Sequence, residues 1–138
     1  MAIVYPLITM VFITFLVSLV LLATRVSSVK SGIVQMEYYQ IFKGGEPPDS
    51  MVKVTRHWSN LYEAPVLFYI ACLLVVILQI SNPLLIQLAW AYVVVRCIHS
   101  AIHMTYNRVA HRLAVFLLSQ LILVVMYISV LVYLLQGI

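Results

Sequence analysis

The chain has 138 residues, of which 64% are hydrophobic and only 9% are charged. This composition excludes a water-soluble globular protein and indicates an integral membrane protein. The net charge of +4 does not indicate nucleic-acid binding, because basic residues in such a protein reflect topology and attraction to anionic headgroups.

The distribution of charge divides the chain into apolar blocks. Residues 1–24, 64–95 and 113–138 carry no charged side chain, so all Lys, Arg, Asp, Glu and His fall into the two windows between them. A helix crosses about 30 Å of hydrocarbon with roughly 20 residues, so the middle block is too long for one span. Asn82-Pro83 divides it, because Asn-Pro favours a turn and proline suits the first turn of a helix.

These blocks predict an all-α integral membrane protein, an antiparallel four-helix transmembrane bundle formed by a single domain over residues 1–138. The expected spans are 4–24, 57–80, 84–105 and 111–135. The apolar N-terminal run has no basic residues before it, so we interpret it as the first span and not as a cleaved signal peptide.

Four spans place both termini on one side of the membrane and both charged windows on the other. Lysine and arginine bias short loops toward the cytoplasm, so we expect both termini on the non-cytoplasmic side. The short loops and the lack of a retention signal favour a bacterial inner membrane over the endoplasmic reticulum.

The first charged window begins with a helical pattern. Val26, Val29, Ile33 and Met36 recur at helical spacing and predict that the first helix extends along the membrane interface. The glycine- and proline-rich run 43–50 then predicts a turn.

Polar residues recur at helical spacing where three spans meet the charged windows. They are Arg56, Asn60 and Glu63 in the second span, Arg96, His99 and His103 in the third, and Arg108, His111 and Arg112 at the start of the fourth. Residues at i, i+3 or i+4, and i+7 share a helix face, so each of the first two sets forms a polar stripe.

Arg96 is the deepest of these charges. At about 1.5 Å per residue from Leu84, it lies ~18 Å into a layer of ~30 Å. An unpaired charge there costs at least a few kcal/mol, so we expect Arg96 to pair with Glu63. Such a pair could belong to a functional site or could only join two helices.

The remaining candidate ligands and thiols carry weaker signals. His99 and His103 are spaced so that one helix face could bind a metal, but no third ligand is evident, and no metal site is predicted. Cys72 and Cys97 fall within spans, where cysteines act as small apolar side chains.

Four motifs together carry a family resemblance. They are Gly44-Gly45-Glu46-Pro47, Arg56-x-x-x-Asn60-x-x-Glu63-x-Pro65, Arg96-x-x-His99 and Arg108-x-x-x-Arg112. On a four-span chain of this length they resemble the MAPEG family, the membrane-associated proteins in eicosanoid and glutathione metabolism. The resemblance covers nearly the whole chain, and its most specific element is the Asn-x-x-Glu of the second span.

The resemblance implies a homotrimer that binds glutathione near the cytoplasmic side, between neighbouring subunits. It assigns glutathione binding to Arg56, Asn60 and Glu63, assisted by Arg96, His99 and Arg108. It also implies that Arg112 lies near the sulfur and favours the thiolate, which makes it the candidate catalytic residue. A lipophilic electrophile would arrive from the surrounding membrane lipids.

This chain departs from the family pattern at several positions. His103 stands where many members have tyrosine, Leu113 and Phe116 where several have serine and tyrosine, and Trp58 where histidine is common. Tyr106 offers a replacement hydroxyl. Two functions therefore remain open: a glutathione-dependent transferase or peroxidase acting on lipophilic electrophiles, and a non-catalytic trimeric scaffold or accessory membrane subunit.

Overall fold

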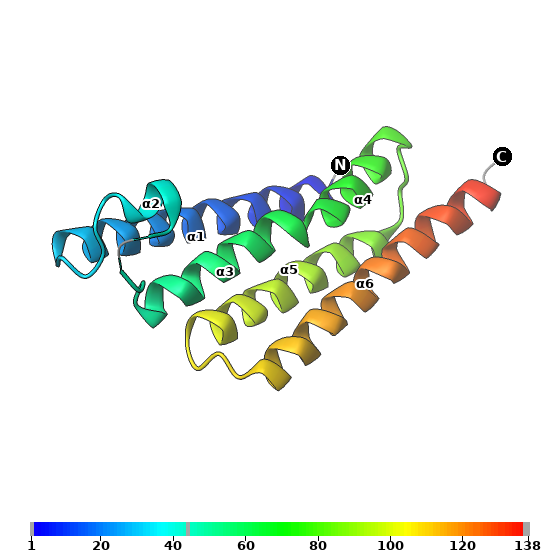
Figure 1. Ribbon diagram of the computed structural model, residues 1–138. Helices are drawn as coiled ribbons and strands as arrows, with labels where there is room; N and C mark the ends of the chain where they lie inside the picture. The colour runs from blue at the N-terminus through cyan, green and yellow to red at the C-terminus, as the bar shows by residue number, and fades with distance from the viewer. Residues whose placement is uncertain (1, 44, 137–138) are drawn as a thin grey trace.

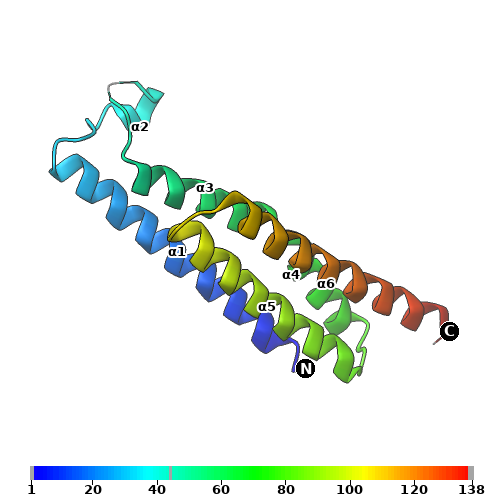
Figure 2. The ribbon, with the colours of Figure 1, turned by 90° about the horizontal axis from the view of Figure 1, so that it is seen from below.

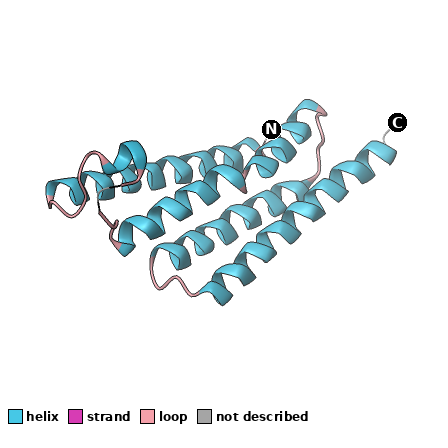
Figure 3. Ribbon diagram, viewed as in Figure 1, coloured by secondary structure: helices cyan, strands magenta, loops and turns pink. Residues whose placement is uncertain are grey.

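The computed structural model describes residues 2–43 and 45–136, so Gly44 of the predicted turn and the chain ends of the predicted domain lie outside the described part. Within it every regular element is a helix (Figure 3). The elements are α1 (Val4–Lys30), α2 (Tyr38–Ile41), α3 (Asp49–Glu63), α4 (Val66–Ile77), α5 (Pro83–Met104) and α6 (Val109–Gln136). Four segments are long and apolar enough to cross a membrane, namely α1, α3 with α4, α5 and α6, which confirms the predicted number of spans.

The spans form an elongated antiparallel bundle (Figure 1). Both termini lie at one end, and α2 and the α5–α6 connection lie at the other (Figure 2). Helix α5 packs against α1, α3 and α6, so it is the most enclosed element. Half of its most apolar 18-residue stretch is buried, compared with 22% in α1 and in α6.

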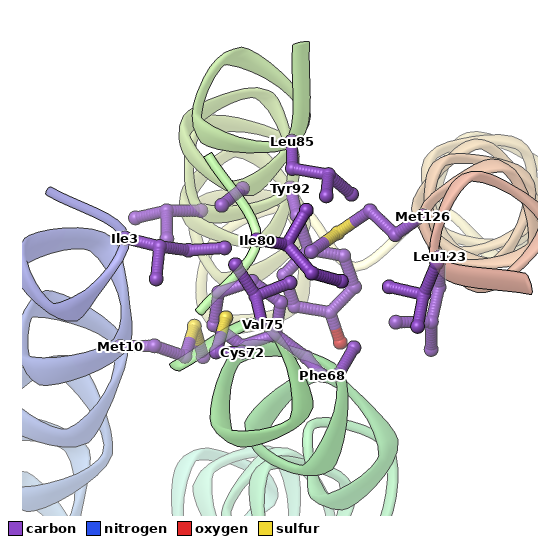
Figure 4. Close-up of a cluster of buried hydrophobic side chains, with 14 of the residues drawn as sticks. Ile3, Met10, Phe68, Cys72, Val75, Ile80, Leu85, Tyr92, Leu123 and Met126 are labelled. Carbon is purple, nitrogen blue, oxygen red and sulfur yellow. The ribbon is translucent and has the colours of Figure 1, made fainter. Parts of the chain in front are cut away.

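The apolar core is formed by side chains of the four spans that point toward one another (Figure 4). Its centre is a stacked pair, Phe68 of α4 and Tyr92 of α5, whose ring centroids are 4.4 Å apart. Met10 of α1 and Met126 of α6 close the core from either side. Cys72 belongs to this core. Residues 64–95 and 113–136, which supply most of this core, carry no charged side chain, so the charges gather at the end of the bundle away from the termini.

Helix α1 extends past the predicted residue 24 but does not follow the apolar pattern to its end. It ends at Lys30, and the Ser31 N–H donates to the Ser27 carbonyl at 3.0 Å. Gly32 has a φ of 71°, a left-handed conformation that suits glycine and stops the helix. The predicted helical extension through Ile33 and Met36 is therefore wrong beyond Lys30.

The second span begins earlier than the predicted residue 57 and is divided in two. Helix α3 starts at Asp49, directly after Pro48, because Met51 and Val54 bury one face of a segment that is polar on the other. Pro65 separates α3 from α4, since proline lacks the N–H that would continue the helical hydrogen bonds.

The predicted turn between the second and third spans is confirmed. The Leu84 N–H donates to the Asn82 side-chain oxygen at 3.0 Å, and Pro83 is the first residue of α5. The capped turn reverses the chain and sets α5 beside the second span.

Candidate functional site

A groove lies between α3, α5 and α6 at the charged end of the bundle, and we call it the polar groove. Its larger part has a volume of about 310 Å³ and is lined by Thr55, Arg56, Ser59, Asn60, Glu63, His99, His103 and Arg112. An adjoining part of about 240 Å³ shares Asn60, His99 and Arg112 and adds Val109, Leu113 and Phe116. The groove is thus polar at one end and apolar at the other, and its size lies within the range of small-molecule sites.

The structure brings most of the predicted site residues together. Those that line the polar groove are Arg56, Asn60, Glu63, His99 and Arg112. Arg96 is buried behind the wall and reaches the groove through Asn60. Arg108 is exposed and lines neither part of the groove. The stripes of α3 and α5 therefore face each other as their spacing predicted.

Arg96 does not pair with Glu63, so that prediction is wrong. Its Nη2 donates to Asn60 Oδ1 at 2.6 Å, whereas the Glu63 side chain is exposed. Asn60 and Glu63 are three residues apart and so point about 60° away from each other around α3. The long arginine side chain extends along α5 to the level of Asn60, which is the polar group that faces it.

The guanidinium of Arg96 is incompletely hydrogen-bonded. Its Nε and Nη1 are buried and have no partner among the described residues. A buried cation with one neutral acceptor is stabilised less than one paired with a carboxylate. The inner wall of the groove therefore retains positive charge that no anion of the described residues contacts.

Arg112 is held from two sides. Its Nη1 lies 3.2 Å from His103 Nε2 and donates to Asn107 Oδ1 at 3.0 Å. An arginine cannot accept a hydrogen bond, so His103 presents an unprotonated Nε2 to it. Both partners are neutral, so they fix the guanidinium without cancelling its charge.

Three buried imidazoles lie together at the wall of the groove, and two of them, His99 and His103, line it. His57 of α3 lies against His99 and His103 of α5, with ring centroids 5.9 and 5.0 Å away, and the latter two are 5.8 Å apart. Arg96 and Arg112 flank this cluster, so a bound cation would be repelled. Among the described residues no group of three His, Cys, Asp or Glu side chains is arranged to hold a metal ion.

Sequence reasoning missed several residues of the site, and the two that contact its predicted histidines and arginine are His57 and Asn107. His57 is fully buried. Its helical spacing from Met51, Val54 and Leu61, which form the buried face of α3, indicated in the sequence that its side chain points inward. Asn107 had no such signal, because its contact with Arg112 depends on the conformation of a connection between helices.

Trp58, which departs from the family pattern, and Tyr106, the expected replacement hydroxyl, both have structural partners outside the groove. The Trp58 Nε1 donates to Ser18 Oγ at 2.9 Å and so joins α3 to α1. Tyr106 is 60% exposed, and its hydroxyl lies 3.1 Å from His111 Nδ1. Tyr106 lines neither part of the polar groove, so within one chain its hydroxyl is not placed where the missing ones would be.

Comparison with known proteins agrees with this architecture and site. The model of the MAPEG family matches residues 3–132. No protein with a curated description and no solved structure matches the chain. Because the family model covers nearly the whole sequence, the chain belongs to the MAPEG family, which includes glutathione transferases and peroxidases as well as non-catalytic members.

Proposed function

We propose that the protein is a membrane-embedded, glutathione-dependent transferase or peroxidase that acts on lipophilic electrophiles. The observation that carries this proposal is the fixed guanidinium of Arg112, which lines a polar cavity next to the apolar surface of Leu113 and Phe116. A polar thiol ligand and an apolar co-substrate would meet at this boundary.

The charges of the polar groove complement those of glutathione. The peptide has two carboxylates and one ammonium, and the groove offers Arg56 and Arg112 as cations and Glu63 as an anion. Asn60 accepts from Arg96 through its oxygen, so its amide N–H groups remain to donate to the peptide backbone. Arg96 adds positive potential from behind.

The proposed catalytic step uses the glutathione sulfur as nucleophile. A cation beside the sulfur stabilises the thiolate over the thiol, and the thiolate is the reactive form. With an aryl halide, the sulfur forms a bond to the ring carbon, the halide leaves with the electrons of the carbon–halogen bond, and the thiol proton passes to water. Arg112 has the charge and the fixed position for this role, with His103 and Asn107 as positioning residues.

The same proposal includes a homotrimer in a bacterial inner membrane, with both termini on the non-cytoplasmic side. The groove is walled by α3, α5 and α6, and we infer that a neighbouring subunit closes its remaining side. Arg25 and Lys53 lie in the last turns of α1 and the first turns of α3, Lys43 follows α2, and Arg108 lies in the α5–α6 connection. These segments lie at the end of the bundle away from the termini, which supports a cytoplasmic location for that end (Figure 1).

A non-catalytic scaffold is the second candidate, and one observation favours it. Leu113 and Phe116 line the groove where several family members have hydroxyls, so little besides Arg112 is present to hold a thiolate. In this case the polar residues would only stabilise the bundle.

Titration of the detergent-purified protein with glutathione separates the two candidates. We expect calorimetric binding, ultraviolet absorbance of a bound thiolate and conjugation of an aryl halide. Arg112→Ala should lower turnover at least ten-fold, or ~1.4 kcal/mol, with a smaller loss of affinity because binding is shared with Arg56, Asn60 and Glu63. Absence of both binding and conjugation in the wild type would establish the scaffold.

A further inference from the structure

A second cavity lies at the charged end of the bundle, and we call it the α1 pocket. It has a volume of about 370 Å³ and is lined by Arg25, Val26, Val29, Lys30, Met36 and Tyr39. None of these residues lines the polar groove. Within one chain the α1 pocket is therefore separate from the polar groove.

Arg25 is the polar centre of this pocket. Its Nε is buried and has no hydrogen-bond partner among the described residues. Its guanidinium carbon lies 5.6 Å from the centroid of the Tyr39 ring, and the Tyr39 hydroxyl donates to Met51 Sδ at 3.2 Å. The aromatic ring thus fixes the direction of the cation but supplies no anion for it.

The length of α1 places Arg25 at the edge of the hydrocarbon. Its 27 residues span about 40 Å at 1.5 Å each, about 10 Å more than the apolar layer. If Val4 lies at one boundary, the other falls close to residue 24. No charged residue precedes Arg25 in the sequence, so the charge pattern gives the same boundary. The phosphates of a bilayer lie just outside this level.

We propose that the α1 pocket binds an anionic phospholipid of the surrounding bilayer. The phosphate would contact Arg25 and Lys30, and the glycerol backbone with the ester-linked ends of the acyl chains would lie against the apolar wall of Val26, Val29 and Met36. Arg25 offers an unused hydrogen-bond donor at phosphate depth, and no acidic residue lines the pocket to compete for it. The apolar wall beside Arg25 matches the uncharged part of the same lipid.

The pocket also lies close to the polar groove. A smaller cavity of about 190 Å³ shares Arg25 and Tyr39 with the α1 pocket and shares Thr55 and Arg56 with the polar groove. A lipid bound at Arg25 would therefore lie one cavity away from the proposed glutathione site. The proposal itself does not depend on catalysis, because its basis is the geometry around Arg25.

Native mass spectrometry of the full chain tests the proposal, with phosphatidylglycerol and phosphatidylcholine added in equal amounts. We expect the wild type to retain phosphatidylglycerol with at least ten-fold preference. Arg25→Gln should remove most of this preference, and Val29→Trp should weaken binding of both lipids by filling the apolar part. Lys43→Gln is the matched control, because it removes the same charge from an exposed loop residue outside the pocket.

Several outcomes would overturn the proposal. They are equal retention of the two lipids, equal losses in Arg25→Gln and Lys43→Gln, and disulfide cross-linking of Val26→Cys between subunits, which would mean that a second copy fills the pocket. Lys30→Gln, at the pocket rim, provides a milder variant if thermal melting shows that Arg25→Gln does not fold. It should lower the preference for phosphatidylglycerol more than Lys43→Gln does.

Discussion

Arg112 depends on neutral neighbours for its position. His103 Nε2 and Asn107 Oδ1 both contact its Nη1, and neither carries a negative charge. A carboxylate in either place would bind the guanidinium more tightly but would also neutralise it toward a ligand. The histidine found where many family members have tyrosine therefore serves Arg112, which would otherwise rest on a single acceptor.

Substitutions of His103 test this positioning role. His103→Phe should lower turnover about ten-fold, or ~1.4 kcal/mol, while glutathione affinity changes less, because Arg112 loses one of two acceptors. His103→Gln should restore most of the activity, since its carbonyl oxygen can take the place of Nε2. Steady-state kinetics with an aryl halide measure the turnover of both variants. His111→Phe is the matched control, because His111 is exposed and lies outside the groove. Equal losses in His103→Phe and His103→Gln would contradict the role.

The contact between Asn60 and Arg96 predicts an unequal effect of removing either partner. Asn60→Leu leaves the buried guanidinium without its acceptor, so it should lower the free energy of unfolding by about 1–3 kcal/mol. Arg96→Met should lower it less, because it removes a buried charge whose Nε and Nη1 already lack partners. Thermal unfolding in detergent decides between them. A larger loss for Arg96→Met would mean that the guanidinium is better satisfied than its contacts indicate.

Sequence spacing predicted which side chains share the site but not how they pair. The i, i+4, i+7 pattern correctly placed Arg56, Asn60 and Glu63 together on one helix beside the groove, but they lie in the second half of α3 and not at the start of the second span. The partner of Arg96 depends on the rotation of α3 about its axis and on the direction of a long side chain. The spacing of residues along one helix gives neither the helix rotation nor the side-chain direction. Opposite charge therefore predicted Glu63 as the partner of Arg96, whereas the geometry of the structure makes it Asn60.

Among the elements, the α5–α6 connection contributes to the site through its backbone. Asn107 has a φ of 49°, and its N–H donates to the Ile102 carbonyl at 2.8 Å, which closes the end of α5. In the same residue the side chain accepts from Arg112. One left-handed residue thus ends one helix and orients a side chain on the next.

Two substitutions separate these contributions of Asn107. Asn107→Gly keeps the left-handed backbone but removes the acceptor, so it should lower turnover several-fold with little loss of thermal stability. Asn107→Ala should lower turnover equally and also destabilise the protein by about 1 kcal/mol, because alanine is disfavoured at positive φ. Melting temperatures and kinetics of the two variants make the comparison. A Gly variant as active as the wild type would show that the side-chain contact has no functional effect.

Helix α3 shows why the start of an element can be misjudged. A search for apolar runs places the second span from residue 57, but the helix begins at Asp49 because Met51 and Val54 pack inward. Such a segment is amphipathic and only moderately apolar, so average hydropathy does not detect it. The break at Pro65 was visible in the sequence, but the uninterrupted apolar run concealed its effect.

For the whole molecule, charge placement predicted the arrangement of the spans. Four spans, a capped turn at Asn82 and both termini at one end are all present. These features depend on apolar blocks of about 20 residues. The free energy of burying such a block in lipid is larger than the preference of any single residue for another conformation. The sidedness and the trimer depend on the membrane and on other copies of the chain, so one folded chain does not determine them.

Cysteine labelling in intact bacterial cells tests the proposed sidedness. In a background with Cys72→Ala and Cys97→Ala, single cysteines replace Glu46 and Gln136, which are exposed at opposite ends of the bundle. A membrane-impermeant maleimide should label only Gln136→Cys, because the basic end faces the cytoplasm. Labelling of Glu46→Cys alone would reverse the orientation, and labelling of both from one side would contradict the four-span topology.

The division of the second span at Pro65 has a consequence for biogenesis. The apolar half, α4, has 12 residues and a length of about 18 Å, which is too short to cross the hydrocarbon by itself. The amphipathic half, α3, must therefore complete the span, although it carries Arg56, Asn60 and Glu63 into the membrane. We expect the second and third spans to leave the translocation channel together as a helical hairpin, in which Asn60 already shields Arg96 when that charge first meets lipid.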